Sequence, residues 1–446
     1  MPTNPNHHVA VIGAGPAGIF AARALAKAGV EVALLNQHIR PGGLAEYGIY
    51  HRKHRLKAGL RKQFIKALEH PAIHYFGNVA VGEGKDISLE HLQAMGFDAL
   101  LVTTGSQSPR RIGIPNEYAK GAYHASEIYY YYNGLPPYSQ QAPEIGDRVL
   151  LIGIGNVMVD IATYLVTERK VKSVTAVARC GPCEIKFAKK EFMRIAANLD
   201  VDDFEEETKR IAKRLQEVGE NLEGSRAFIL SAYHHAEPTG SPTRFTFRFL
   251  SLPYEVLTNV EGRVKGLKVE DTYLVFTVGK RPIPYGLGTF RTLEADTIIY
   301  CVGTKADPSI GLPVWRDSFA TAPRPRYPVH HTSYEAYNPQ EMRFIEGIFL
   351  AGWARRANFG LVGAVRKDGE LAAEAVLHYL AEKETANAPS PLGALGEHLK
   401  NLGKPIADKA AWHRLLEAEA REAEKRGTPG FRFTTNEEML KAAGLA

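Results

Sequence analysis

Three glycines follow a short apolar strand near the start of the chain, in a spacing suited to holding a phosphate group. Residues 9–18 read Val-Ala-Val-Ile-Gly-Ala-Gly-Pro-Ala-Gly, and an alanine-rich helix is expected next. Gly13 permits the tight turn, Gly15 lets the backbone approach a pyrophosphate, and Gly18 lets the helix pack closely on the strand. The pyrophosphate would face unpaired N–H groups at the positive end of the helix dipole. A second apolar strand follows, and this order favours a nucleotide-binding unit over a plain glycine-rich turn.

The same pattern of strand and glycine turn recurs in the middle of the chain, at Gly153 and Gly155. Met158 stands where the third small residue is usual, so the helix is expected to sit slightly differently. The strand expected at 173–178 ends in Arg179. Because a cation suits the 2′-phosphate of NADP whereas an acid suits NAD, the second unit is predicted to bind NADP.

Further turns in the first unit favour a flavin over a bare nicotinamide cofactor. They are the glycine-rich loop at 41–44, the small-residue end of an apolar strand at 97–105, and a third strand and turn at 347–353. Residues 358–363 precede another expected helix, whose N-terminus could stabilise negative charge on a reduced flavin ring. The alternative for this last feature is an ordinary helix cap.

Length and composition indicate a globular protein of two or three domains, since the chain has 446 residues. The formal charge of +6 is mild and does not demand nucleic acid. Three cysteines fit a reducing compartment. With a polar start at 1–8 and no apolar run long enough to span a bilayer, we predict a cytoplasmic location and no membrane partner. No metal site is predicted, because Pro71 between His70 and His74 argues against a helix that presents both imidazoles.

Two basic stretches are candidates for docking an acidic protein, with an ordinary solvated surface as the alternative. The stretches are residues 52–62 and 209–214, and the docking cations are expected near Arg52, Lys53, Arg55 and Lys57 in the first and near Lys209 and Arg210 in the second.

Several short motifs spread over nearly the whole chain carry a resemblance to a known family. They include Tyr-Asn-Gly-Leu-Pro at 132–136, Arg-x-Gly-Pro at 179–182, Lys190-Glu191, and the tail 428–440. With the two dinucleotide units, they resemble the two-dinucleotide-binding-domain flavoproteins, and more closely adrenodoxin reductase and its bacterial ferredoxin-NADP reductase relatives.

The resemblance implies an α/β fold with two Rossmann-like domains, the NADP domain inserted into the FAD domain. Residues 1–107 and 306–446 would form the FAD domain, the latter ending in a helical tail, and 108–305 the NADP domain. It further implies that NADPH reduces the flavin by hydride transfer, and that the flavin passes single electrons to a ferredoxin-type iron-sulfur protein.

The family's binding positions carry over to this sequence, whereas no catalytic residue is assigned. FAD would be held by Gly13, Gly15, Pro16, Ala17, Gly18, Asn36, Gly43, Leu44, Thr104, Gly105, Gly352, Trp353, Gly360, Leu361 and Val362. NADP would be held by Gly153, Gly155, Asn156, Val157, Arg179 and Glu191.

Three positions depart from the family pattern. Asn36 stands where an acid usually meets the flavin ribose, and Cys180 replaces the second of two adjacent arginines, which could weaken the preference for NADP. Phe359 places an aromatic ring beside the flavin and could narrow access to it.

The sequence leaves three alternative functions open. Cys180 and Cys183 have the spacing of a redox dithiol, which would suit a disulfide reductase, although inert thiols are the simpler interpretation. The chain could be the electron-input subunit of a larger reductase, but it lacks a cysteine-rich extension. It could also be a flavin-binding protein that has lost the use of nicotinamide, as Met158 and Cys180 suggest.

Overall fold

The computed structural model describes residues 7–276, 282–383 and 389–446, which divide by their contacts into two compact units. The first unit comprises Met1–Pro109, Tyr132–Gln140 and Thr304–Ala446, and the second comprises Arg110–Tyr131 and Gln141–Gly303. Residues 132–140 thus belong to the first unit, although the predicted NADP domain includes them. Which cofactor each unit holds stays a prediction at this point. Most of the polar start at 1–8, on which the predicted location partly rests, lies outside the described residues.

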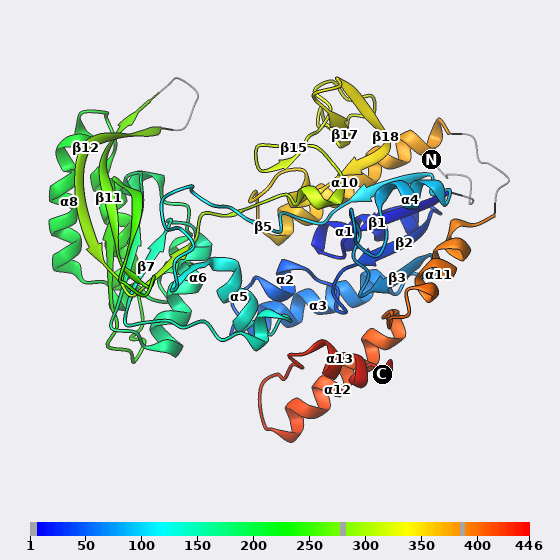
Figure 1. Ribbon diagram of the computed structural model, residues 1–446, viewed down its shortest axis with the longest axis horizontal. Coiled ribbons are helices and arrows are strands. Elements are labelled where there is room, and N and C mark those ends of the chain that lie inside the picture. The colour runs from blue at the N-terminus through cyan, green and yellow to red at the C-terminus, as the bar shows by residue number, and fades with distance from the viewer. Residues whose placement is uncertain (1–6, 277–281, 384–388) are drawn as a thin grey trace. The chain divides into compact units, whose positions relative to one another are not determined.

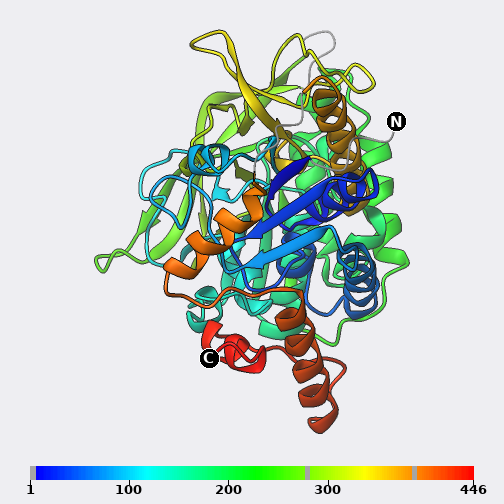
Figure 2. The ribbon, with the colours of Figure 1, turned by 90° about the vertical axis from the view of Figure 1, so that its right-hand side faces the viewer.

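A six-stranded sheet in the order β17-β18-β4-β1-β2-β3 forms the centre of the first unit. All neighbouring strands are parallel except β17 and β18. Figure 2 shows its blue and light-blue strands side by side. The strands are β1 (His8–Ile12), β2 (Glu31–Asn36), β3 (Ile73–Gly77), β4 (Ala99–Val102), β17 (Glu335–Asn338) and β18 (Arg343–Leu350). Two short antiparallel pairs join β5 (Ser108–Pro109) to β14 (Thr304–Lys305) and β15 (Val314–Trp315) to β16 (Ser318–Phe319).

Helices cover both faces of this sheet, because successive strand residues point to opposite sides. Val9 and Val11 pack in one apolar cluster and Ala10 and Ile12 in the other. The first cluster receives α1 (Pro16–Lys27), α3 (His54–Leu68), α10 (Val362–Ala381) and a tryptophan of α12 (Lys409–Lys425), and the second receives α4 (Leu89–Ala94) and α11 (Pro391–Asn401). Both faces are buried, which explains why the strands read as continuous apolar runs.

Helices α1 and α10 lie side by side (Figure 1) and approach each other closely at a glycine. A Cβ atom on Gly369 would lie 2.3 Å from the Ala17 carbonyl oxygen, and one on Gly352 would lie 2.8 Å from the Ala17 Cβ. The N-terminal turn of α1 and the loop before α10 are therefore held together.

The C-terminal tail, α12 and α13 (Asn436–Ala442), is tied to the loop that follows β2. Arg40 forms a bidentate ion pair with Glu419 of α12, and both side chains are buried. Glu419 also accepts a hydrogen bond of 3.0 Å from the Phe433 N–H. The tail thus fixes the residue that precedes the glycine-rich loop 41–44.

The second unit is built on a five-stranded parallel sheet in the order β6-β13-β7-β8-β9. The strands are β6 (Ala122–His124), β7 (Arg148–Ile152), β8 (Ser173–Val177), β9 (Arg244–Arg248) and β13 (Thr297–Tyr300). The helices of this part of the chain are α5 (Ala125–Tyr132), α6 (Asn156–Tyr164), α7 (Lys189–Phe192), α8 (Val201–Gln216) and α9 (Leu222–His234). A separate antiparallel sheet contains β10 (Ser251–Thr258), β11 (Val264–Val275) and β12 (Ile283–Glu294).

The predicted fold class is confirmed, since each unit is α/β and has a sheet of mainly parallel strands at its centre. Among the described helices, none is long and apolar enough to cross a membrane.

Candidate functional site

The first glycine turn has the close approaches that its spacing predicts. Gly13 has a φ of +107°, and a Cβ atom there would lie 2.8 Å from the Thr103 carbonyl oxygen. A Cβ atom on Gly18 would lie 1.9 Å from the Gly13 carbonyl oxygen, whereas one on Gly15 would meet no protein atom within 4 Å. Gly13 and Gly18 are therefore needed by the protein itself, while Gly15, the N-cap of α1, leaves open space at a helix N-terminus.

Thr103 secures this turn, a role that the sequence analysis missed. Its hydroxyl donates to the carbonyl oxygens of Gly13 at 2.7 Å and Ile12 at 3.1 Å. The sequence carried a signal for this role, because Thr103 directly follows β4, which pairs in parallel with β1 and so ends beside the glycine turn. Thr104 and Gly105, the predicted binding residues, come next and are half-buried.

The glycine-rich loop that follows β2 lies against the first glycine turn. The Gly42 N–H donates to the Ala14 carbonyl oxygen at 2.6 Å, and a Cβ atom on Gly43 would lie 3.1 Å from the Gly15 Cα. Leu44 begins the short helix α2 (Leu44–Tyr47) immediately after this contact. The structure therefore brings together two of the segments that were predicted to hold the flavin nucleotide.

Asn36 is buried at the end of β2, and its contacts there are structural. Its Oδ1 accepts from the Ala14 N–H at 3.2 Å, and its Nδ2 donates to the His38 and Arg40 carbonyl oxygens at 2.7 and 2.8 Å. The amide thus holds the glycine turn to the loop after β2. A ribose contact of Asn36 stays a prediction, and Oδ1 is the atom that could make it.

The loop before α10 presents two apolar side chains to solvent. Phe359 and Leu361 are 50% and 74% exposed. Asn358 fixes the backbone, since its side chain bonds the Thr304 N–H at 3.0 Å and the Thr304 carbonyl oxygen at 2.6 Å. Trp353 Nε1 donates to the Phe359 carbonyl oxygen at 2.9 Å, so two of the predicted flavin segments, 352–353 and 360–362, are adjacent.

The second glycine turn repeats this geometry at the carboxyl end of β7. Gly153 has a φ of +125°, and a Cβ atom there would lie 2.6 Å from the Cys301 carbonyl oxygen. Gly155 is the N-cap of α6, and its Cβ position is open. Met158 is fully buried, so the larger residue packs inward and the helix still begins at Asn156.

The segment that carries the other predicted NADP residues runs beside this turn. Asn156 Oδ1 accepts from the Ala188 N–H at 3.0 Å, and the Lys186 N–H donates to the Ile154 carbonyl oxygen at 3.0 Å. Val157 is 39% exposed, and Arg179 is exposed at the end of β8. Glu191 lies in α7 and pairs with Arg194 at 3.2 Å.

The thiols of Cys180 and Cys183 are poorly suited to redox chemistry. Burial raises the pKa of Cys180, and burial together with Glu220 raises the pKa of Cys183 to about 12. Because the thiolate is the reactive form, both side chains favour the inert state. Burial and the nearby Glu220 also raise the pKa of Glu184 to about 7. This acidic neighbourhood argues against the dithiol alternative.

The first basic stretch is only partly available for docking. Arg52 and Arg55 are exposed, and Lys53 is half-buried. Lys57 is 4% exposed, and its Nζ donates to Asn133 Oδ1 at 2.5 Å. The docking prediction is therefore wrong for Lys57, which instead connects α3 to the 132–140 segment.

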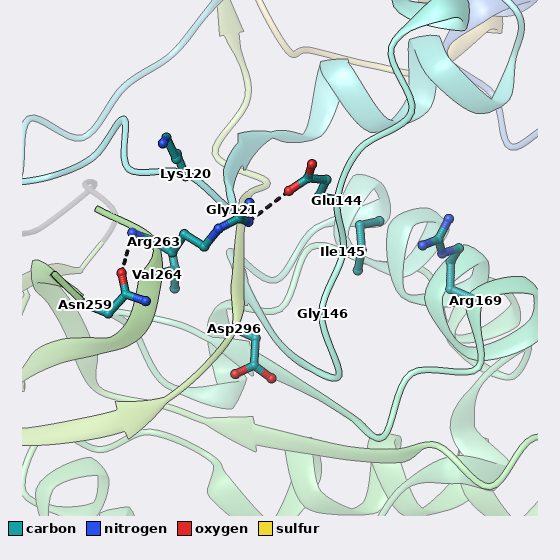
Figure 3. Close-up of a pocket in the computed structure, with 10 residues that line it drawn as sticks. All are labelled: Lys120, Gly121, Glu144, Ile145, Gly146, Arg169, Asn259, Arg263, Val264 and Asp296. Carbon is teal, nitrogen blue, oxygen red and sulfur yellow. Dashed lines mark hydrogen bonds and ion pairs between the residues drawn. The ribbon is translucent and has the colours of Figure 1, made fainter. Parts of the chain in front are cut away.

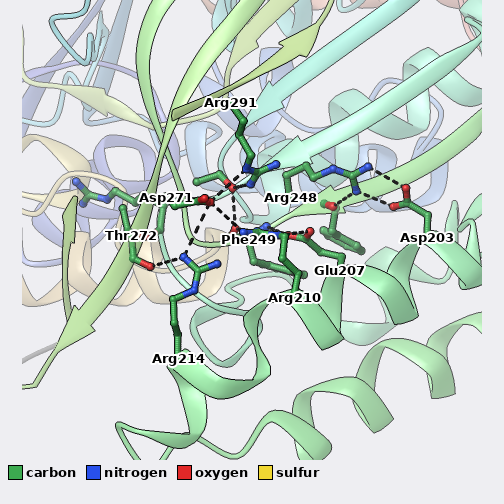
Figure 4. Close-up of polar contacts among 12 residues, drawn as sticks. Asp203, Glu207, Arg210, Arg214, Arg248, Phe249, Asp271, Thr272 and Arg291 are labelled. Carbon is green, nitrogen blue, oxygen red and sulfur yellow. Dashed lines mark hydrogen bonds and ion pairs between the residues drawn. The ribbon is translucent and has the colours of Figure 1, made fainter. Parts of the chain in front are cut away.

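The second basic stretch is largely compensated by neighbouring acids. Lys209 is exposed and lies 2.8 Å from Glu206. Arg210 is half-buried and donates to Glu207 at 2.7 Å and to Asp271 at 2.9 Å (Figure 4). Since both of these carboxylates are within the second unit, the charge of Arg210 is compensated there, and its docking role stays a prediction.

A pocket of about 420 Å³ opens elsewhere in the second unit (Figure 3). Gly146 and Asp296, just before β7 and β13, line it, as do Glu144 and Arg263, which pair at 2.9 Å. It lies at the amino ends of these parallel strands, whereas the glycine turn lies at the carboxyl end. Its lining, within the described parts of the chain, includes none of the residues predicted to bind a cofactor.

The fold and its two glycine turns resemble those of the two-dinucleotide-binding-domain flavoproteins. Residues 7–219 match the family model described as pyridine nucleotide-disulphide oxidoreductase. NADPH-ferredoxin reductase FprA of Mycobacterium leprae is 27% identical to the chain, with 98% of each protein covered. The mitochondrial NADPH:adrenodoxin oxidoreductase of Arabidopsis thaliana is 24% identical, with 98% of this chain and 95% of that protein covered.

A solved structure has the same fold over the same length. It is Mycobacterium tuberculosis FprA in complex with NADPH, which superposes with a TM-score of 0.81 at 24% identity and covers 98% of this chain and 99% of that one. The chain is thus similar over nearly all of its residues to the NADPH-ferredoxin and adrenodoxin reductases. The resemblance stated from the sequence is confirmed.

Proposed function

We propose that this protein is an FAD-dependent oxidoreductase that passes electrons from NADPH to a ferredoxin-type iron-sulfur protein. The observation that carries the proposal is the pair of glycine turns, each at the carboxyl end of a strand in a parallel sheet and each with an open N-cap glycine, Gly15 and Gly155. Ligands of α/β sheets bind at that edge.

The residues of the first unit fit an FAD molecule. Gly15 offers open space and helix N–H groups to a pyrophosphate, and the Gly42-Gly43 loop approaches the same turn. The N-terminus of α10 supplies a second set of unpaired N–H groups, flanked by Leu361 and by Trp353. Bound FAD would supply the conversion of a two-electron hydride donor into one-electron transfers.

The residues of the second unit fit NADP, with the pyrophosphate at Gly155 and the adenosine at the end of β8. Arg179 is exposed there and suits a 2′-phosphate. Asn156, Val157 and Glu191 are proposed to line the nucleotide further along α6 and α7. The parts of the chain assigned to each cofactor, 1–107 with 306–446 and 108–305, are proposals of the same kind.

The first experiment mixes the purified protein anaerobically with NADPH and, separately, with NADH in a stopped-flow instrument. We expect the flavin absorbance to bleach rapidly with NADPH and slowly with NADH. Faster bleaching with NADH would refute the assignment of the 2′-phosphate site. Absence of bleaching with either cofactor would favour a flavin-binding protein without nicotinamide chemistry.

The acidic partner is proposed to dock on the first basic stretch, through the exposed Arg52 and Arg55. The double variant Arg52→Glu/Arg55→Glu should slow reduction of an acidic [2Fe–2S] ferredoxin at low salt, because charge complementarity raises association rates. Arg421→Glu/Lys425→Glu on α12 makes the same change in net charge on exposed residues and serves as the control. Equal rates for both double variants would refute this docking surface.

A cytoplasmic location is retained as part of the proposal, on the grounds of composition alone. Relatives with mitochondrial names show that the compartment can differ among homologues.

A further inference from the structure

A cluster of charged side chains packs between α8 and the strands β9, β11 and β12 of the second unit (Figure 4). It contains four arginines and three carboxylates: Arg210, Arg214, Arg248 and Arg291 with Asp203, Glu207 and Asp271. Within this cluster positive charge exceeds negative charge by one, and the side chains are half-buried or buried.

Arg214 is the arginine that carries the excess charge. Arg210, Arg248 and Arg291 each donate to a carboxylate at 2.7 to 3.2 Å. The Arg214 guanidinium lies 3.9 Å from Asp271, a carboxylate already bonded to Arg210 and Arg291, and its closer contact is the neutral Thr272 carbonyl oxygen at 2.9 Å. Burial and the neighbouring Arg210 lower the pKa of Arg214. A guanidinium in this situation gains from an additional anion.

The loop that follows β8 lies against the same part of α8. Thr272, whose carbonyl oxygen meets Arg214, donates its hydroxyl to the Arg179 carbonyl oxygen at 2.8 Å. A Cβ atom on Gly181 would lie 2.9 Å from Leu215, the residue next to Arg214. Thr272 therefore connects the Arg214 guanidinium to the backbone of Arg179, whose side chain is proposed to meet the 2′-phosphate.

We propose that Arg214 supplies the second cation for the 2′-phosphate of NADPH, in place of the arginine that Cys180 replaces. The inference rests on the proposed function and adds a specificity-determining residue to it. Two cations would then face the phosphate from different elements, Arg179 from the end of β8 and Arg214 from the last turn of α8.

The test measures binding of 2′-AMP and 5′-AMP to the FAD-loaded protein by calorimetry, which needs no turnover. Arg214→Met should weaken 2′-AMP binding by roughly tenfold or more, since a charged hydrogen bond is lost, and should leave 5′-AMP binding unchanged. Arg214→Lys should retain most of the affinity. Arg248→Met is the matched control, because Arg248 belongs to the same cluster but bonds Asp203.

Kinetics should show the same selectivity. Arg214→Met should raise KM for NADPH with little change in kcat, and KM for NADH should stay the same. The proposal is overturned if Arg214→Met binds 2′-AMP as the wild type does, or if Arg248→Met weakens it equally. If the wild-type protein binds 2′-AMP no more tightly than 5′-AMP, the proposed NADP site itself is wrong, and the inference fails with it. This outcome is seen in the wild type and is therefore distinguishable from the two outcomes that depend on the variants.

Discussion

The ion pair between Arg40 and Glu419 gives the sharpest prediction about stability. Both side chains are more than nine-tenths buried, and the guanidinium faces the carboxylate in bidentate fashion. Glu419→Leu leaves the Arg40 charge buried without its partner, which costs about 3–5 kcal/mol. For a chain of 446 residues that unfolds as one unit, that loss lowers Tm by roughly 3–5 °C. Since Arg40 precedes the loop that contacts the first glycine turn, flavin release should shift to lower temperature as well.

The double variant Arg40→Met/Glu419→Leu separates the buried charge from the other contacts of Glu419. Both variants lose the bond from the Phe433 N–H, but only the single variant buries an uncompensated cation. We expect the double variant to be the more stable of the two by about 2–3 kcal/mol. The assay is a thermal scan that follows flavin fluorescence and circular dichroism together. Equal destabilisation of the two variants would refute the reasoning.

Three further predictions concern the glycine turn, the thiols and a buried histidine. Gly18→Ala should yield protein with little bound flavin, measured by absorbance, because the new methyl group would overlap the Gly13 carbonyl oxygen. Cys180→Ser and Cys183→Ser should each leave the rate of flavin reduction by NADPH within about twofold of wild type, since both thiols have raised pKa values; a loss of activity in both would revive the dithiol alternative. Burial lowers the pKa of His124 to about 4, so stability is retained above pH 6.5 and falls by up to about 3 kcal/mol as pH drops from 6.5 to 4. His124→Gln should flatten this pH dependence in urea titrations.

Local patterns were sufficient to predict the two glycine turns. The apolar runs at β1 and β7 and the glycines after them lie within a few residues of one another, and steric limits on a strand-turn-helix connection allow few alternatives. The turn at 347–353 and the loop 41–44 could also be expected from their glycines. Their packing against Ala17 and Gly15 required the structure, because it depends on residues far apart in the chain.

Charged residues were predicted less well than glycines, for a physical reason. A basic run indicates charge but not whether acids from other segments neutralise it. Lys57 is buried beside Asn133, and Arg210 meets Asp271 of β11, a residue 61 positions away. Neither partner can be inferred from the helix that carries the cation.

The departures from the family pattern have consequences that depend on their neighbours. Met158 is accommodated because its side chain enters the core, which leaves the N-terminus of α6 and the open space at Gly155 unchanged. Because Cys180 stands in place of an arginine, the loop after β8 has one cation fewer. The excess positive charge of the nearby cluster is on Arg214, which bonds Thr272, and Thr272 in turn bonds the Arg179 carbonyl oxygen of that loop. A phosphate requires positive charge nearby, and the cations need not be adjacent in the sequence. Loss of one arginine from the adjacent pair therefore does not by itself remove the phosphate site. The preference for NADPH over NADH should therefore decline more in Arg179→Met/Arg214→Met than in either single variant, as ratios of kcat/KM for the two cofactors would measure.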